Sequence, residues 1–120
     1  MNLEEQVCSL DLAKRLKEFG VKHESAFYWV RDTTEADERW VVNDRKWGYG
    51  DNISAFTVAE FGEMLPKECI TVKHGNGYGD PESIWVASFL DTKHREPAKT
   101  EADARAKMLI HLIEKGIIQP

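Results

Sequence analysis

The sequence is poor in cysteine, and the two that it has, Cys8 and Cys69, lie far apart in the 120-residue chain. They form no CxxC motif and no pair with the spacing of a zinc site. We therefore expect two reduced, buried thiols, as is usual in a cytoplasmic protein. The sequence predicts no metal ligands and no cofactor.

Long apolar runs are also missing. No run approaches the roughly 20 residues that a helix needs to span a bilayer. The first five residues carry two glutamates, where a secretory signal peptide would carry basic residues. Membrane insertion and secretion are not expected, and the predicted location is the cytoplasm.

An excess of basic charge is absent as well. Lysine and arginine number 16 against 21 aspartates and glutamates, so the formal net charge is −5. A broad attraction to nucleic acid or anionic lipid is therefore not expected, although a local basic patch stays possible. With 42% hydrophobic and 31% charged residues, the composition is typical of a globular protein and predicts one domain over residues 1–120.

Helical periodicity is clear in three segments, residues 2–19, 57–65 and 100–115. Each begins at a side chain that can cap a helix and ends at a glycine or proline. The expected caps are Asn2, Thr57 and Thr100, and the expected stops are Gly20, Pro66 and Gly116. In the last segment, Ala102, Ala106, Leu109 and Ile113 form one apolar stripe, flanked by Met108 and Leu112.

Four segments have the composition of strands: residues 26–30, 39–43, 69–74 and 83–90. Turn residues between them predict two antiparallel hairpins. The expected order is α-β-β-α-β-β-α, an α+β fold with a four-stranded, mainly antiparallel sheet and helices packed on it. Nearly every residue of 84–90 is apolar, so this strand is predicted to be central, covered on both faces, with the closing helix as one cover.

Three stretches, LAKRLKE at residues 12–18, ISAFTVAE at 53–60 and TEADARAKMLI at 100–110, carry a resemblance to known proteins. They resemble small uncharacterised proteins of bacteria and their prophages, and the likeness covers most of the chain. The resemblance implies a bacterial or prophage setting. That family carries no established activity, so no catalytic or binding residue is transferred to these positions.

The residue types of an acid–base or metal site occur in the second half of the chain, at His74, Asp80, Asp91 and His94. If residues 83–90 form a strand, the first two lie about 20 Å from the last two. The sequence therefore favours solvated strand-end residues, and their functional role stays open. His111 has no acidic partner at ligand spacing and is predicted to be a surface or boundary residue.

A DNA-binding hypothesis depends on the basic residues of the first helix. Residues 12–16, followed by Gly20 and Val21 and then by Tyr28 and Trp29, resemble a helix-turn-helix of the excisionase or resolvase kind. The residues expected to contact DNA are Lys14, Arg15, Lys17 and Lys22. The second helix of that motif would be residues 24–30. The adjacent aromatic residues of this segment favour a strand, so DNA binding is the alternative and not the first hypothesis.

Large aromatic residues near turns are the remaining positive feature. Trp29 and Trp85 are expected in the core, whereas Trp40, Trp47 and Tyr49 flank a polar loop and a glycine-rich turn. Tryptophan and tyrosine are frequent anchors of protein interfaces. The first hypothesis is a non-enzymatic protein-binding or accessory protein that contacts an unknown protein partner through these three residues. The oligomeric state is left open.

Overall fold

The structure is a computed structural model that describes residues 2–22, 24–32, 39–46, 52–75 and 84–120. Within these residues, helices and strands follow one another in an order that differs from the expected one. They are α1 (Leu3–Gln6), α2 (Leu10–Glu18), β1 (Tyr28–Asp32), β2 (Arg39–Asn43), β3 (Asn52–Ser54), α3 (Val58–Met64), β4 (Cys69–His74), β5 (Ile84–Phe89), β6 (His94–Ala98) and α4 (Glu101–Glu114).

The strands form two antiparallel sheets of three strands, in the orders β2-β1-β3 and β4-β5-β6. The α+β class and both predicted hairpins are confirmed. The single four-stranded sheet is wrong, because each hairpin gains a third strand and none of the described strands links the two sheets. The short β3 gives almost no alternation to detect. Pro97 in β6 argues against a strand, yet proline is tolerated on an edge strand such as this one.

The predicted first helix is interrupted at Val7, so the continuous helix predicted over residues 2–19 is wrong. Val7 forms an isolated antiparallel bridge with Thr57, and the Cys8 amide donates to the carbonyl of Phe56 at 2.9 Å. Ser9 then caps α2 by accepting from the Leu12 amide. Apolar spacing continues across the break, which is why periodicity alone does not show it.

Most predicted helix ends are confirmed. Asn2 and Thr57 accept from the expected amides, and Gly20 and Gly116 have φ of 88° and 70°, where glycine is favoured. α3 ends before Pro66. Thr100 accepts from the amide of Asp103 at 3.2 Å. The Asp103 carboxylate, however, accepts from the Ser9 amide at 2.7 Å, which ties α2 to α4.

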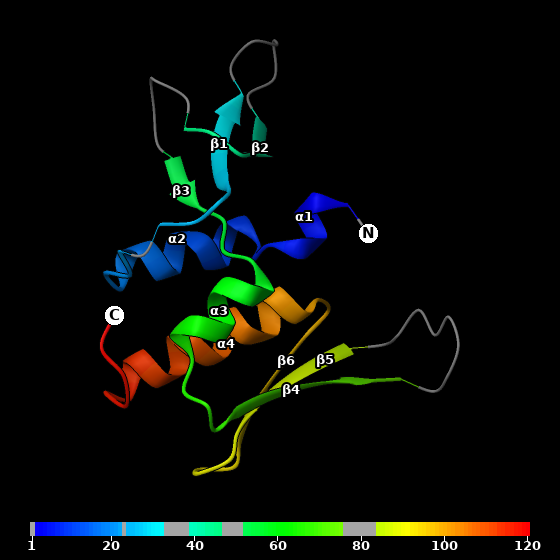
Figure 1. Cartoon of the computed structure of the whole chain (residues 1–120), viewed down its shortest axis with the longest axis vertical. Helices are drawn as coiled ribbons and strands as arrows, with labels where there is room; N and C mark the ends of the chain where they lie inside the picture. Colours follow the sequence, from blue (N-terminus) through cyan, green and yellow to red (C-terminus); the bar gives the residue numbers. More distant parts are fainter. Residues whose placement is uncertain (1, 23, 33–38, 47–51, 76–83) are drawn as a thin grey trace.

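The elements are stacked along the longest axis of a flat molecule of 45 × 37 × 19 Å. Figure 1 shows the sheet β2-β1-β3 at one end, then α1 and α2, then α3 and α4, and the sheet β4-β5-β6 at the other end. Two clusters of buried residues lie between these layers. The first joins α2, α3, β1 and β3, the second backs on β5, and α4 contributes to both.

α4 therefore buries two stripes and not one. Ala106, Leu109 and Ile113 pack in the first cluster, toward α2, while Ala104, Met108 and Leu112 pack in the second, against β5. The prediction that the Ala102-Ala106-Leu109-Ile113 stripe covers β5 is wrong. The cover of β5 is the second stripe, which includes the small Ala104 that the predicted stripe left out.

β5 is central in its sheet, as predicted, but it is covered on one face only. Ala87 and Phe89 are buried toward α4, whereas Ile84 and Ser88 point to the opposite side of the sheet. This strand therefore has one face packed on α4 and one face without a covering helix, where Val86 is buried beside its register partners Val72 and Pro97.

Candidate functional site

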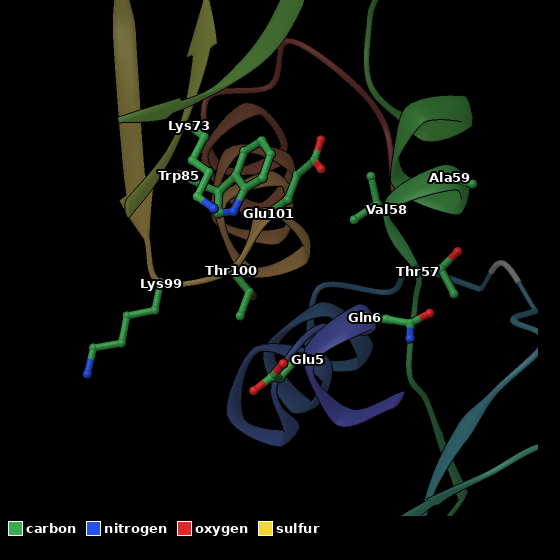
Figure 2. A pocket seen from close by; sticks show the side chains of 10 residues that line it. All are labelled: Glu5, Gln6, Thr57, Val58, Ala59, Lys73, Trp85, Lys99, Thr100 and Glu101. Carbon is green, nitrogen blue, oxygen red and sulfur yellow. The ribbon is translucent and has the colours of Figure 1, made fainter. Parts of the chain in front are cut away.

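A cleft of about 690 Å³ opens where the start of α4 meets α1, the start of α3, the end of β4 and the start of β5. We name it the Trp85 cleft. Its lining residues come from five segments that are distant in the sequence (Figure 2): Glu5, Gln6, Thr57, Val58, Ala59, Lys73, Trp85, Lys99, Thr100 and Glu101.

One wall of the Trp85 cleft is the inner face of the sheet. Lys73 and Trp85 are register partners across β4 and β5, so their side chains lie side by side on the face that looks toward α4 (Figure 2). Trp85 is half-buried: it packs against the second cluster of buried residues and also lines the cleft. The expectation of a core tryptophan therefore holds for Trp29, which is buried, and only in part for Trp85.

A network of polar groups joins the elements that line this cleft. The Thr71 hydroxyl donates to the Glu101 carboxylate at 2.9 Å and accepts from the Arg105 guanidinium at 3.1 Å. Arg105 also pairs with Glu101 at 3.2 Å and donates to the carbonyl of Val58. One guanidinium thus joins α3, β4 and α4, so the walls of the cleft are held in position.

The charges at the mouth of the cleft are not balanced. Lys73 and Lys99 have no ion-pair partner among the residues that the structure describes. The Glu101 carboxylate is neutralised by Arg105, which leaves Glu5 as the opposing carboxylate. Sequence reasoning missed these residues because the strands, α1 and α4 bring them together only in the fold.

A second surface lies on the opposite side of the same sheet. Ile70, Val72, Ile84 and Leu90 have exposed fractions of 47%, 47%, 38% and 55%. The strand register places the first three on one face around Val86, and Leu90 continues the alternation of β5. We call these residues, with Pro97 of β6, the outer sheet face.

The predicted protein-contact residues are described only in part. Trp40 is half-buried on β2, packs against the first cluster, and lies beneath two cations: Lys14 Nζ is 5.4 Å and the Arg31 guanidinium 5.2 Å from its ring. Such distances are typical of cation–π contacts. Trp47 and Tyr49 lie outside the described residues.

The basic residues of the DNA-binding hypothesis are all exposed. Lys14, Arg15 and Lys17 lie on α2, where Arg15 pairs with Glu114 at 3.2 Å, and Lys22 follows the helix. The second helix of a helix-turn-helix is not formed, because residues 24–27 are not helical and β1 follows them. The expected strand is confirmed there, and the helix-turn-helix geometry is wrong.

The structure does not bring together the acid–base candidates that it describes. His74 pairs in register with Ile84 and His94 with Phe89, so they lie at opposite ends of β5, about 17 Å apart at 3.3 Å per residue. Asp91 is exposed, and Asp80 lies outside the described residues. His94 instead stacks on His111, with ring centroids 3.4 Å apart, and its Nε2 lies 3.3 Å from Glu96.

Both cysteines are free, and Cys8 is buried as predicted, whereas Cys69 is half-buried. Burial raises the pKa of the Cys8 thiol to about 12 and also raises the pKa of Cys69. Neither thiol therefore has the character of an activated nucleophile.

No protein-family model, curated protein or solved structure matches this chain. The resemblance to bacterial and prophage proteins stays a prediction. Among the described residues, no group of three or more histidine, cysteine, aspartate or glutamate side chains is placed to hold a metal ion. Those residues also include no helix with the length and apolar character needed to cross a membrane.

Proposed function

We propose that this chain is a non-enzymatic protein-binding protein whose contact surface is the outer sheet face. The observation that carries the proposal is the exposure of four large aliphatic side chains, Ile70, Val72, Ile84 and Leu90, on one side of one sheet. Contiguous apolar patches of this kind mark interaction sites. Figure 1 shows this sheet at the end of the stack, with none of the described helices or strands beyond it.

The side chains around the outer sheet face indicate which partner surface is complementary to it. Arg95 pairs in register with Ser88, so it lies on the same face, and His74 extends that face at the end of β4. Both residues are exposed and lie at the rim, so the centre of the face is apolar. A protein partner with an apolar strand or helix face and an acidic side chain opposite Arg95 is complementary to this surface.

A non-enzymatic role is supported by the arrangement of the titratable side chains. His74 and His94 lie at opposite ends of β5, and His94 is engaged with His111 and Glu96. In the Trp85 cleft, Glu101 is held by Arg105 and Thr71. None of these described groups forms the paired nucleophile and base that acyl or phosphoryl transfer needs.

The experiment is a comparison of the Ile70→Lys/Val72→Lys double variant with the wild type in affinity capture from a bacterial host, followed by titration of each captured protein. Both changes are on half-exposed positions, so the melting temperature is expected to stay close to the wild-type value. We expect at least about a tenfold loss of affinity for the genuine partner, since a charge at the centre of an apolar interface is left unpaired. Lys67→Glu is a matched control, because it changes charge at an exposed residue next to the same sheet. Equal affinity of all three proteins for every captured partner would contradict the proposal.

Trp40, Trp47 and Tyr49 remain a second proposed contact for the same function. The observation that favours them is the half-buried Trp40 ring under the cations of Lys14 and Arg31, an arrangement with both apolar and charged surface. Trp40→Leu in the same titration is expected to weaken binding only if this region contacts the partner. A folded variant that binds as the wild type does would remove Trp40 from the interface.

DNA binding is kept as the alternative because Lys14, Lys17 and Lys22 present three exposed cations in one stretch of chain. A fluorescence-anisotropy titration with random duplex DNA at low salt tests it. The alternative requires binding that weakens steeply with added salt and is lost in Lys14→Glu/Lys17→Glu. Absence of binding at low salt would eliminate it.

A bacterial or prophage origin is supported by the sequence resemblance alone.

A further inference from the structure

We infer that the Trp85 cleft binds a small organic anion with a flat apolar part, such as an aromatic carboxylate. This site lies on the inner side of the β4-β5-β6 sheet, whereas the outer sheet face lies on the other side. The inference is therefore independent of the proposed protein contact, and either can fail without the other.

The dimensions and walls of the cleft fit a ligand of this class. A volume of about 690 Å³ lies within the range of about 300–1,000 Å³ that is usual for small-molecule sites. Trp85 lies on the sheet side, and Val58 and Ala59 line the opposite side (Figure 2). An indole ring beside small aliphatic side chains favours a flat apolar group, which can pack against the ring in an offset arrangement.

The charge of the cleft selects an anion. Lys73 and Lys99 are the two lining cations, and no ion pair engages either of them within the described part of the chain. Glu101 is neutralised by Arg105 at 3.2 Å, so Glu5 alone opposes the two lysines. A carboxylate held by an ammonium group makes a charge-assisted hydrogen bond, which is stronger than a neutral one.

The cleft is assembled before a ligand arrives. Arg105 reaches the Val58 carbonyl at 3.2 Å and the Thr71 hydroxyl at 3.1 Å, which fixes α3 and β4 relative to α4. The Glu60 side chain and Thr57 form a complete capping box that fixes the start of α3 on the other wall. Binding therefore loses little free energy to reorganisation of the walls.

The experiment is a titration of the full chain with 2-naphthoate, with uncharged 2-naphthalenemethanol and with inorganic phosphate, followed by ¹⁵N-correlated NMR. With 2-naphthoate we expect saturable shifts at the Trp85 indole N–H and at the amides of Lys73 and Thr100. The alcohol, which keeps the ring but lacks the charge, should bind at least about tenfold more weakly. Phosphate, which lacks the ring, should cause no saturable shift at Trp85 at the concentrations that saturate with 2-naphthoate.

Variants separate the cleft from other surfaces. Lys73→Gln and Lys99→Gln should each weaken 2-naphthoate binding by about fivefold or more and leave the affinity for 2-naphthalenemethanol unchanged. Lys67→Gln, which removes a charge outside the cleft, should bind 2-naphthoate as the wild type does. The Ile70→Lys/Val72→Lys variant should bind 2-naphthoate as the wild type does, although its affinity for the protein partner is expected to be lost.

Two results would overturn the inference. Equal affinity for the acid and the alcohol would show that the lysines do not select an anion. Shifts confined to the amides of Ile70, Val72 and Ile84, with none at Trp85, would place the ligand on the outer sheet face and leave the cleft without one.

Discussion

Glu60 holds two distant segments of the chain together through one carboxylate. It accepts from the Ser25 hydroxyl at 2.7 Å, from the Ala26 amide at 2.9 Å and from the Thr57 amide at 2.8 Å. Burial would raise the pKa of this carboxyl, but the three donors outweigh burial and hold the pKa below its ordinary value of 4.5. The capping glutamate of α3 therefore also fixes the segment that leads into β1.

Glu60→Gln is expected to lower the free energy of unfolding by about 1–3 kcal/mol at neutral pH, because the new amide places N–H donors against backbone donors. The folded pKa of Glu60 is depressed, so the wild-type advantage is present above the unfolded pKa and is lost as the pH falls through the folded pKa. Urea titrations of both proteins across the acid range measure this difference. Glu63→Gln, an exposed change on the same helix, is the control. A constant difference at all pH values would show that the charge of Glu60 is not the cause.

Cys8 is expected to resist alkylation in the folded protein. Its side chain is fully buried and its pKa is about 12, so almost no thiolate is present at about pH 8. Cys69 is half-buried and serves as the internal control. Peptide mass spectrometry after iodoacetamide treatment should find Cys8 modified only in denaturant. Labelling of Cys8 as fast as Cys69 under native conditions would mean that the α1–α2 break opens readily.

At the scale of elements, α4 shows that helical periodicity predicts one buried stripe of a helix but not a second. The stripe of Ala106, Leu109 and Ile113 follows directly from the periodicity of the sequence. The second stripe, of Ala104, Met108 and Leu112, depends on a sheet that lies on the other side of the helix. Because Ala104 is as compatible with solvent as with a core, its burial could not be predicted from its residue type.

The substitution Ala104→Lys tests whether α4 buries one stripe of side chains or two. Ala104 is fully buried against the second cluster, so a lysine there places a charge in an apolar environment, and we expect a loss of about 3 kcal/mol or more, enough to unfold much of the protein. Leu109→Asp is expected to unfold the protein for the same reason on the other face. Glu114→Gln, an exposed change, should cost less than about 1 kcal/mol. A folded, fully stable Ala104→Lys protein would refute the second stripe.

The stacked pair of His94 and His111 makes the contact between β6 and α4 sensitive to pH. Burial, and then the charge of His94, lower the pKa of His111; Lys115 acts in the same direction, and Glu96 and Glu114 oppose it. The folded protein thus binds this proton less well than the unfolded chain does. The contribution of His111 to stability is fully present above the ordinary pKa of 6.5 and is lost as the pH falls below that value.

Thermal melts between about pH 7.5 and pH 5.5 are therefore expected to show a falling melting temperature, and His111→Gln should reduce that slope. His74→Gln, at an exposed histidine of β4, should keep the wild-type slope. If His74→Gln and His111→Gln changed the slope equally, the stacked pair would not be its origin.

At the scale of the whole molecule, α4 couples the two sheets. It supplies residues to both clusters of buried side chains, and the Ser9 amide donates to Asp103 at its first turn. We expect one cooperative unfolding transition, in which changes in either cluster shift the same melting temperature. Leu109→Ala and Leu112→Ala, each expected to cost about 2–5 kcal/mol, test this when calorimetry is compared with NMR signals from both sheets. Two separate transitions would show that the halves fold independently.

The candidate surfaces were less predictable than the elements. Caps, stops and hairpins follow from local chemistry at residues such as Thr57 and Gly116. The Trp85 cleft needs the register that places Lys73 beside Trp85, and it needs α1 and α3 to lie across from them. Local sequence contains neither relation. The outer sheet face escaped prediction for a related reason, because an apolar strand does not say how many of its faces are covered.

The position of α4 also has a consequence for the order of events during synthesis. Both clusters of buried side chains need residues of Glu101–Glu114, which follow all six described strands in the chain. While the nascent chain is shorter than this, the buried face of β5, which includes Phe89, has no covering helix, and the first cluster lacks the side chains that α4 contributes to it. Neither half can reach its final packing until α4 has left the ribosome, so folding is expected to begin late and then proceed in both halves together.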